Sequence, residues 1–150
     1  EVLSLLAGLD NTCRLRVQGW WTYEVCIGRH VRQFREGGAS HTLGVYQNLQ
    51  TDSATFMGNP GGPGDVWFEQ RYLQGDGCQE TSGPRETLVR YMCSHHDQTL
   101  VTMVTEPSPC RYVVEVRTPA VCAHPFFRDN QAAAQALNVH CYQAEPEPDG

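Results

Sequence analysis

Residues 20–26 read Trp-Trp-Thr-Tyr-Glu-Val-Cys, and the two adjacent tryptophans decide how the chain is interpreted. Successive side chains of a strand point to opposite faces, so Trp20 and Trp21 cannot both enter one core through one face. One can be a core residue, and the other must then lie at a rim, an interface or a ligand. An indole beside polar residues can hold the apolar face of a sugar ring. The alternative is that both indoles pack in a strand that crosses between two sheets.

The length and net charge of the chain limit the classes of protein to which it can belong. A chain of 150 residues is expected to form one domain with a real core. Its 11 Lys and Arg against 17 Asp and Glu give a net charge of -6, which argues against nucleic-acid binding. No apolar run is long enough to span a bilayer, so we expect no membrane insertion. The start lacks both Met and a signal-peptide pattern, which suggests a mature or trimmed fragment.

Seven cysteines are many for a cytosolic domain of this length. They lie at positions 13, 26, 78, 93, 110, 122 and 141. Their wide dispersion is typical of disulfides in an oxidising compartment, whereas a zinc site favours short Cys-x-x-Cys pairs, which the chain lacks. The nearest zinc candidates are Cys93 with His95 and His96, Cys122 with His124, and His140 with Cys141. Because seven is odd, one thiol is left over, and we expect it to be Cys141.

The body of the chain reads as short strands separated by turns. Alternation or β-branched composition predicts strands at residues 14–17, 42–47, 66–73, 87–93, 99–105 and 112–117. Pairs of Gly, Pro, Asp and Ser punctuate these runs, which favours an antiparallel sandwich or flattened barrel. We expect a Gly- and Pro-rich surface loop at residues 58–64, a short helix at residues 130–137 and a disordered tail or linker at residues 145–150.

Four stretches with matching order and cysteine spacing carry a family resemblance. They are Trp20–Phe34, Cys78–Cys93 with Pro-Arg-Glu at 84–86, Glu106–Tyr112, and Thr118–Pro125. Over residues 13–127 the chain resembles the mannose-6-phosphate-receptor-homology family, and the double Trp is similar to its endoplasmic-reticulum lectins. The resemblance implies an all-β fold, a flattened antiparallel β-barrel or two-sheet lectin fold with three disulfides. Residues 1–12 are then a lead-in, and residues 128–150 a short helix and acidic tail.

The resemblance implies a mannose pocket made of Gln33, Arg85, Glu106 and Tyr112. Sugar hydroxyls both donate and accept, and the Gln33 amide can match either role. Arg85 offers a rigid fork of donors, and an ionised Glu106 accepts from two vicinal hydroxyls. Tyr112 adds a phenol and a flat ring. The alternatives are a structural ion pair between Arg85 and Glu106, a solvated Gln33 and a core Tyr112.

The resemblance also extends the site to the indole pair. The resemblance implies that Trp20 and Trp21 contact a second mannose and favour glycans with an exposed terminal α1,6-linked mannose. Such contacts contribute about 1 kcal/mol each, so they tune specificity. Gln79 departs from the family, because the residue after this cysteine is often Asp in animal members. Glutamine keeps the hydrogen-bonding capacity without the charge, and Gln79 is retained as a candidate contact.

The disulfides and the cellular role are likewise implied by the resemblance. The implied pairs are Cys13–Cys26, Cys78–Cys110 and Cys93–Cys122, each stabilising by about 2–4 kcal/mol. The implied protein is a non-enzymatic lectin of the endoplasmic-reticulum lumen. It binds trimmed high-mannose N-glycans of misfolded glycoproteins and delivers them to a membrane ubiquitin-ligase complex through an adaptor, for endoplasmic-reticulum-associated degradation.

Two classes of alternative remain open. One is a glycan-binding subunit of a processing enzyme, of the glucosidase II β or phosphotransferase γ type. The other is a redox or zinc protein that uses His95, His96, His140 and Cys141. We recognise neither a nucleophile-histidine arrangement nor paired carboxylates. We therefore expect no enzymatic activity, no cofactor and no metal.

Overall fold

The computed structural model describes residues 2–47, 55–57 and 66–128. The helical elements are α1 (Val2–Leu6), η1 (Ala7–Leu9) and η2 (Pro119–Val121). The strands are β1 (Cys13–Gln18), β2 (Trp21–Cys26), β3 (His30–Phe34), β4 (Ser40–Tyr46), β5 (Thr55–Met57), β6 (Trp67–Leu73), β7 (Gly77–Cys78), β8 (Gly83–Pro84), β9 (Glu86–Cys93), β10 (Leu100–Ser108) and β11 (Arg111–Thr118). The predicted all-β fold is confirmed.

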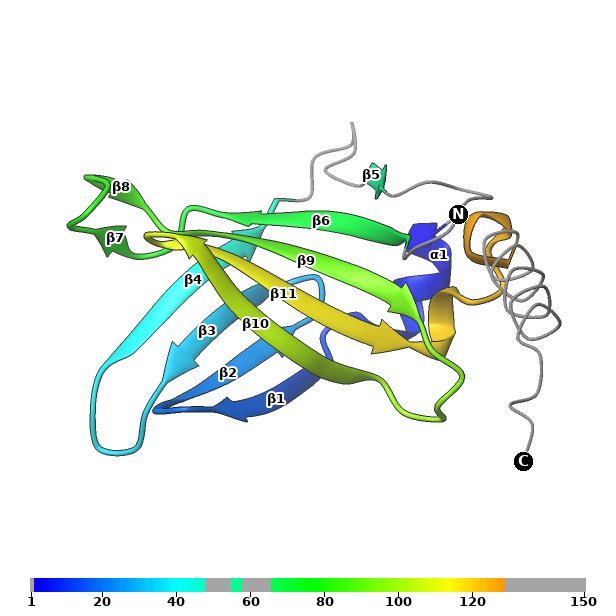
Figure 1. The fold of residues 1–150 in the computed structure, drawn as a ribbon, viewed down its shortest axis with the longest axis horizontal. Coiled ribbons are helices and arrows are strands. Elements are labelled where there is room, and N and C mark those ends of the chain that lie inside the picture. Colours follow the sequence, from blue (N-terminus) through cyan, green and yellow to red (C-terminus); the bar gives the residue numbers. More distant parts are fainter. Residues whose placement is uncertain (1, 48–54, 58–65, 129–150) are drawn as a thin grey trace, which may run out of the picture.

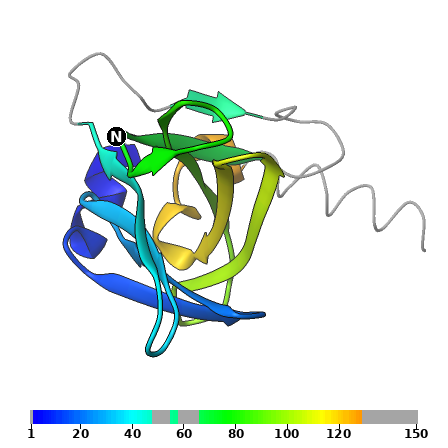
Figure 2. The same ribbon diagram turned by 90° about the vertical axis from the view of Figure 1, so that its left-hand side faces the viewer.

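One large sheet curls into a nearly closed barrel (Figures 1 and 2). Its strand order is β1-β2-β3-β4-β6-β9-β11-β10, with β5 added on β6, while β7 and β8 form a separate hairpin. Side chains join the two edge strands. The Gln18 amide donates to the Val104 carbonyl at 2.7 Å and accepts from the Val104 N–H at 3.3 Å. Arg14 Nε donates to the Thr99 carbonyl at 3.1 Å. These bonds close the seam between β1 and β10 without a backbone ladder.

The sheet differs from the expected antiparallel pattern at one pair of strands. β9 and β11 are parallel, with Glu86 opposite Arg111 and Cys93 opposite Thr118. The physical reason lies in the topology. After β9 the chain crosses to β10, which turns back through a hairpin and inserts β11 between β10 and β9. The sheet is therefore mixed, although its other pairs within the described residues are antiparallel.

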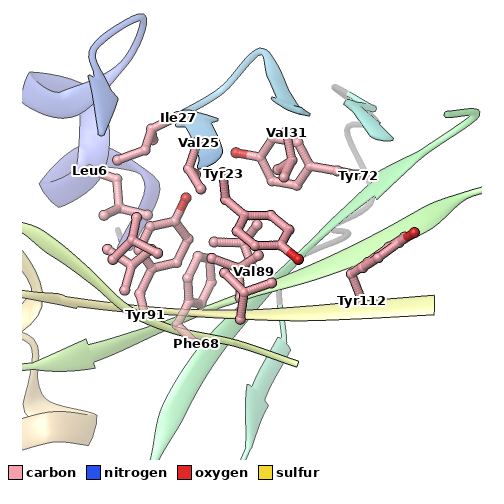
Figure 3. Packing of buried hydrophobic residues seen from close by; sticks show 14 of the residues in the cluster. Leu6, Tyr23, Val25, Ile27, Val31, Phe68, Tyr72, Val89, Tyr91 and Tyr112 are labelled. Atoms are coloured by element: carbon pink, nitrogen blue, oxygen red, sulfur yellow. The ribbon is translucent and has the colours of Figure 1, made fainter. Parts of the chain in front are cut away.

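Alternating strand residues fill the barrel with valines and aromatic rings (Figure 3). Tyr112, Val114 and Val116 are at most 3% exposed, which confirms their predicted common face. A polar group also lies inside. Buried Gln70 accepts hydrogen bonds from the Tyr91 hydroxyl at 2.7 Å and the Tyr72 hydroxyl at 3.2 Å. The core is thus held by directed hydrogen bonds as well as by packing.

The three implied disulfides, Cys13–Cys26, Cys78–Cys110 and Cys93–Cys122, are all present. The first joins residues that face each other across β1 and β2, so it closes the base of the hairpin whose tip carries Trp20. Cys141, the loop at 58–64, the helix at 130–137 and the tail at 145–150 lie outside the described residues. Within the described part of the chain, no helix has the length and apolar character needed to cross a bilayer.

The two ends of the barrel have different structures. α1 and η2 pack together at one end, where Leu6 is buried in the core beside Ile27 (Figures 1 and 3). The opposite end, at the left in Figure 1, gathers the β1–β2, β3–β4 and β10–β11 turns and the β7–β8 hairpin. Turns of this kind leave polar side chains near solvent, so this end offers a surface for a ligand.

Candidate sugar-binding site

The turn-rich end of the barrel brings together residues that are far apart in the chain. Gln33 lies in β3, Arg85 between β8 and β9, Glu106 near the end of β10, and Tyr112 at the start of β11. Figure 2 views the barrel from this end. The parallel pairing of β9 with β11 sets Tyr112 opposite Thr87, two residues after Arg85. This unexpected parallel pair therefore helps to bring Arg85 and Tyr112 together.

A chain of hydrogen bonds links three of the predicted residues. Arg85 Nη1 donates to the Tyr112 hydroxyl at 2.7 Å, and that hydroxyl donates to Gln33 Oε1 at a longer 3.5 Å. Gln33 and Tyr112 are only 5% and 3% exposed, so both are held by packing as well as by these bonds. Tyr112 lies in the hydrophobic core, which was the alternative interpretation of this residue. Its hydroxyl also belongs to the hydrogen-bonded polar cluster. Gln33 is not the solvated strand residue of the other alternative.

Arg85 has hydrogen-bonding capacity to spare. Its Nη1 also lies 3.4 Å from the Cys110 sulfur, a weak acceptor. Its Nε is buried and has no hydrogen-bond partner among the described residues. An unmet buried donor costs about 1–3 kcal/mol. An acceptor oxygen on a ligand that reaches this buried nitrogen would remove that penalty.

Glu106 is exposed, and its carboxylate stabilises the β10–β11 turn by a hydrogen bond. Its Oε2 accepts from the Cys110 N–H at 2.9 Å, and Cys110 adopts a left-handed conformation with φ of 63°. Among the described residues no ion pair within 4 Å joins Glu106 to Arg85, so the structural ion pair considered as an alternative does not form here. The remaining carboxylate lone pairs can accept hydrogen bonds from a ligand.

Tyr23 also belongs to this cluster, and the sequence reasoning missed it. It lies opposite Gln33 in the β2–β3 register and is 8% exposed. Burial raises its pKa above the usual value, and the nearby Tyr112 and Glu106 raise it further. Burial likewise raises the pKa of Tyr112, with Glu106 adding to the effect and Arg85 opposing it. Both phenols therefore stay protonated at neutral pH and can act as donors. Strand parity with Trp21 was the signal that could have found Tyr23.

The two tryptophans have unequal environments. Trp20 is 79% exposed because it occupies the two-residue turn between β1 and β2, where Gly19 has a φ of 63°. A glycine at the first position of such a turn is typical of tight hairpins. Trp21 begins β2, packs partly against the core, and lies 5.8 Å from the His41 ring. The Trp21 indole is thus partly structural, whereas the Trp20 indole is exposed to solvent.

Comparisons with known proteins show the family to which this chain belongs. A family model described as glucosidase II beta subunit-like protein matches residues 11–78. Human protein OS-9 is 34% identical over 141 residues, which cover 87% of this chain and 21% of that protein. The OS-9 homolog of Oryza sativa subsp. japonica is 31% identical over 150 residues, which cover 91% and 49%. The chain carries a mannose-6-phosphate-receptor-homology (MRH) domain of the OS-9 type. It spans about a fifth and about half of these two relatives.

A solved structure agrees with this MRH assignment. The MRH domain of Yos9, determined in complex with α3,α6-Man5, superposes with a TM-score of 0.70 at 20% identity. The match covers 87% of this chain and 88% of that chain. At this identity the likeness supports the fold.

Gln79 is exposed in the turn between β7 and β8. Within the described residues, no hydrogen bond joins it to the other predicted site residues. The neighbouring Glu80 interacts electrostatically with the candidate site, because its charge contributes to the raised pKa of Tyr112. Sequence reasoning missed Glu80, although it follows Gln79 directly. In this MRH domain the negative charge near the third cysteine is therefore carried by Glu80.

The sulfur chemistry bears on the zinc alternative. Among the residues that the structure describes, three groups have possible metal-ligand atoms within 4.8 Å of one another, and each group contains two cysteines. One of them consists of Cys93, His95 and Cys122. In all three groups the two sulfurs are joined as disulfides. A disulfide sulfur is not a thiolate and does not bind zinc as one. These clusters therefore mark disulfides of the MRH domain.

Proposed function

We propose that this MRH domain is a lectin that binds a terminal mannose through Gln33, Arg85, Glu106 and Tyr112. The observation that carries the proposal is the hydrogen-bond chain from Arg85 through Tyr112 to Gln33, together with the unpaired buried Nε of Arg85. An OS-9-type family and a related fold solved with a mannose glycan support the same ligand class.

Each residue would meet a different part of the sugar. Arg85 supplies donors to neighbouring ring hydroxyls, and the exposed Glu106 carboxylate accepts from a vicinal pair. The Gln33 amide both donates and accepts, which suits the axial 2-hydroxyl that distinguishes mannose from glucose. A single sugar offers few contacts, so binding should be weak. We expect a dissociation constant on the order of tens to hundreds of micromolar for one site.

We further propose that the ligand is a trimmed high-mannose N-glycan with an exposed terminal α1,6-linked mannose. The exposed Trp20, beside the half-buried Trp21, would contact the next sugar. The domain, residues 13–127, would act without catalysis in the endoplasmic-reticulum lumen. There it would deliver misfolded glycoproteins for degradation through an adaptor of a membrane ubiquitin-ligase complex. The three disulfides support an oxidising compartment.

A second function is favoured by the family model matched over residues 11–78, whose description names a glucosidase II beta subunit. In that case the domain would recruit glycans to a catalytic partner. Co-purification of the full protein with a glucosidase, and glycan binding that does not depend on Trp20, would favour this function.

The test of mannose binding is Arg85→Ala, titrated with mannose-terminated oligosaccharides by calorimetry. Losing charge-assisted hydrogen bonds of about 1.5–3 kcal/mol should weaken binding by about 10- to 150-fold. The midpoint of thermal unfolding should change little. Arg111→Ala is the matched control, because Arg111 forms an exposed ion pair with Glu86 at 2.7 Å and should leave binding unchanged. Unchanged binding in Arg85→Ala, or a large loss of stability, would refute the assignment.

A further inference from the structure

We propose that Arg35 is a positioning residue that fixes the two indoles for the second sugar. This inference rests on the proposed function and deepens it. The Arg35 guanidinium carbon lies 5.7 Å from the Trp20 ring centroid and 5.4 Å from the Trp21 ring centroid. Both distances fall within the range of cation–π contact. One cation therefore bridges a largely exposed indole and a half-buried one.

The sheet register explains why Arg35 meets the pair. Thr22 of β2 faces Phe34 of β3, so Arg35, the next residue after β3, comes beside Trp21 at the start of β2. The main chain at Arg35 is fixed by the turn. Its N–H donates to the Ala39 carbonyl at 3.2 Å, and its carbonyl accepts from the Gly38 N–H at 3.1 Å. The guanidinium thus extends from a braced backbone toward the indoles.

Gly38 leaves room for this side chain. A Cβ atom added at Gly38 would lie 2.7 Å from Arg35 Nε and 2.9 Å from Arg35 Cγ. The Arg35 side chain therefore passes directly over the glycine. Any larger residue at position 38 would push the guanidinium away from its observed place. Gly38 has no left-handed φ, so alanine there adds bulk without backbone strain.

The charge of Arg35 remains available to the rings. Within the described part of the chain, no carboxylate lies within 4 Å of its guanidinium. A planar guanidinium stacks on aromatic faces better than a compact ammonium does. Trp20, Arg35, Glu36, Gly37 and Gly38 also line one open groove of about 460 Å³. A sugar that follows the terminal mannose along this groove would contact an indole already held in place.

The consequence is preorganisation of Trp20. A side chain that is 79% exposed has many orientations, and binding must select one of them at an entropic cost. Arg35 restricts these orientations before the glycan arrives. Its loss should affect the sugar beyond the terminal mannose and leave the terminal site unchanged. The contact should also be visible in the free protein, because it alters the surroundings of both indoles.

The experiment compares Arg35→Met, Arg35→Lys and Gly38→Ala with the unsubstituted chain, using methyl α-D-mannoside and an α1,6-linked mannotriose as ligands. Arg35→Met and Gly38→Ala should weaken mannotriose binding by about three- to tenfold, since exposed cation–π contacts are modest. Methyl mannoside binding should be unchanged, and Arg35→Lys should recover part of the loss. Gly8→Ala is the control, because a Cβ there meets no atom within 4 Å.

A second readout needs no sugar. In a Trp67→Phe background, Arg35→Met and Gly38→Ala should change the tryptophan emission of the free protein, whereas Gly8→Ala should not. Unchanged mannotriose binding in Arg35→Met, equal losses for both ligands, or unchanged emission would overturn the inference. If the unsubstituted chain bound neither sugar, the proposed function would fail, and the emission would still decide whether Arg35 holds the indoles.

Discussion

Glu106→Gln removes the negative charge of Glu106 and keeps the size and shape of its side chain. In the structure Glu106 Oε2 accepts from the Cys110 N–H at 2.9 Å and so supports the β10–β11 turn. Glutamine keeps an oxygen that can accept this bond, so the turn and the Cys78–Cys110 disulfide should remain in place. What disappears is the ionised acceptor for two sugar hydroxyls.

The expected magnitude follows from the difference between charged and neutral hydrogen bonds. A charge-assisted bond is roughly twice as strong as a neutral one, with net contributions of about 1.5–3 against about 0.5–1.5 kcal/mol. Replacing the charge should therefore reduce binding by about 1–2 kcal/mol, or about 5- to 30-fold in affinity. The free energy of unfolding should change by less than about 0.5 kcal/mol, as is usual for an exposed position.

The assay is a titration with a mannose-terminated trisaccharide, with Glu86→Gln as the control. Glu86 pairs with Arg111 next to the β10–β11 turn, so its substitution changes the net charge equally. A spectrophotometric titration of the phenols gives a readout without sugar. Because the Glu106 charge raises the pKa of both Tyr23 and Tyr112, Glu106→Gln should lower these pKa values. Unchanged affinity alongside lowered phenol pKa values would show that Glu106 lies in the cluster but does not bind the sugar.

Two further predictions concern the barrel itself. Tyr91→Phe removes the buried hydroxyl that donates to Gln70, so urea unfolding at neutral pH should show a loss of about 1–1.5 kcal/mol. Burial also raises the pKa of Tyr91 well above 10.0, so the folded protein retains a proton that the unfolded chain releases near that pH. Stability of the unsubstituted chain should therefore fall as the pH rises above about 10, and less steeply in Tyr91→Phe; equal slopes would contradict this assignment. Gln18→Ala removes the amide that bonds both backbone groups of Val104 and should cost about 1–2 kcal/mol in urea unfolding. A neutral result would mean that water replaces the seam bonds.

Much of the barrel follows from local patterns in the sequence. Alternation places Tyr112, Val114 and Val116 on one buried face, and the family resemblance supplies the three disulfide pairs. β1 shows the limit of this reasoning. Its alternating apolar residues Leu15 and Val17 are 61% and 75% exposed. The alternate polar residues of β1 are the more buried ones, because Arg14 bonds the Thr99 carbonyl and Gln18 bonds Val104 across the seam. Only the tertiary fold reveals this requirement.

The site was partly predictable for similar reasons. Motif positions predict Arg85 and Tyr112 as candidate site residues, and the structure joins the two by a short hydrogen bond. They do not identify Tyr23, which enters the cluster through its register with Gln33. Strand alternation predicts that the two indoles differ because they point to opposite faces of one strand. The structure gives another reason. Trp20 is exposed because the Gly19 turn removes it from the strand, and this depends on the register of β1 with β2.

The most direct test of the account is binding of the unsubstituted chain to two matched high-mannose glycans. One glycan should end in an exposed α1,6-linked mannose, and the other should carry an additional mannose that caps this residue. The account predicts measurable binding to the first and at least about tenfold weaker binding to the second, with the preference reduced in Trp20→Ala. Equal binding to both glycans, or a preference that Trp20→Ala leaves intact, would contradict the role assigned to the indole pair.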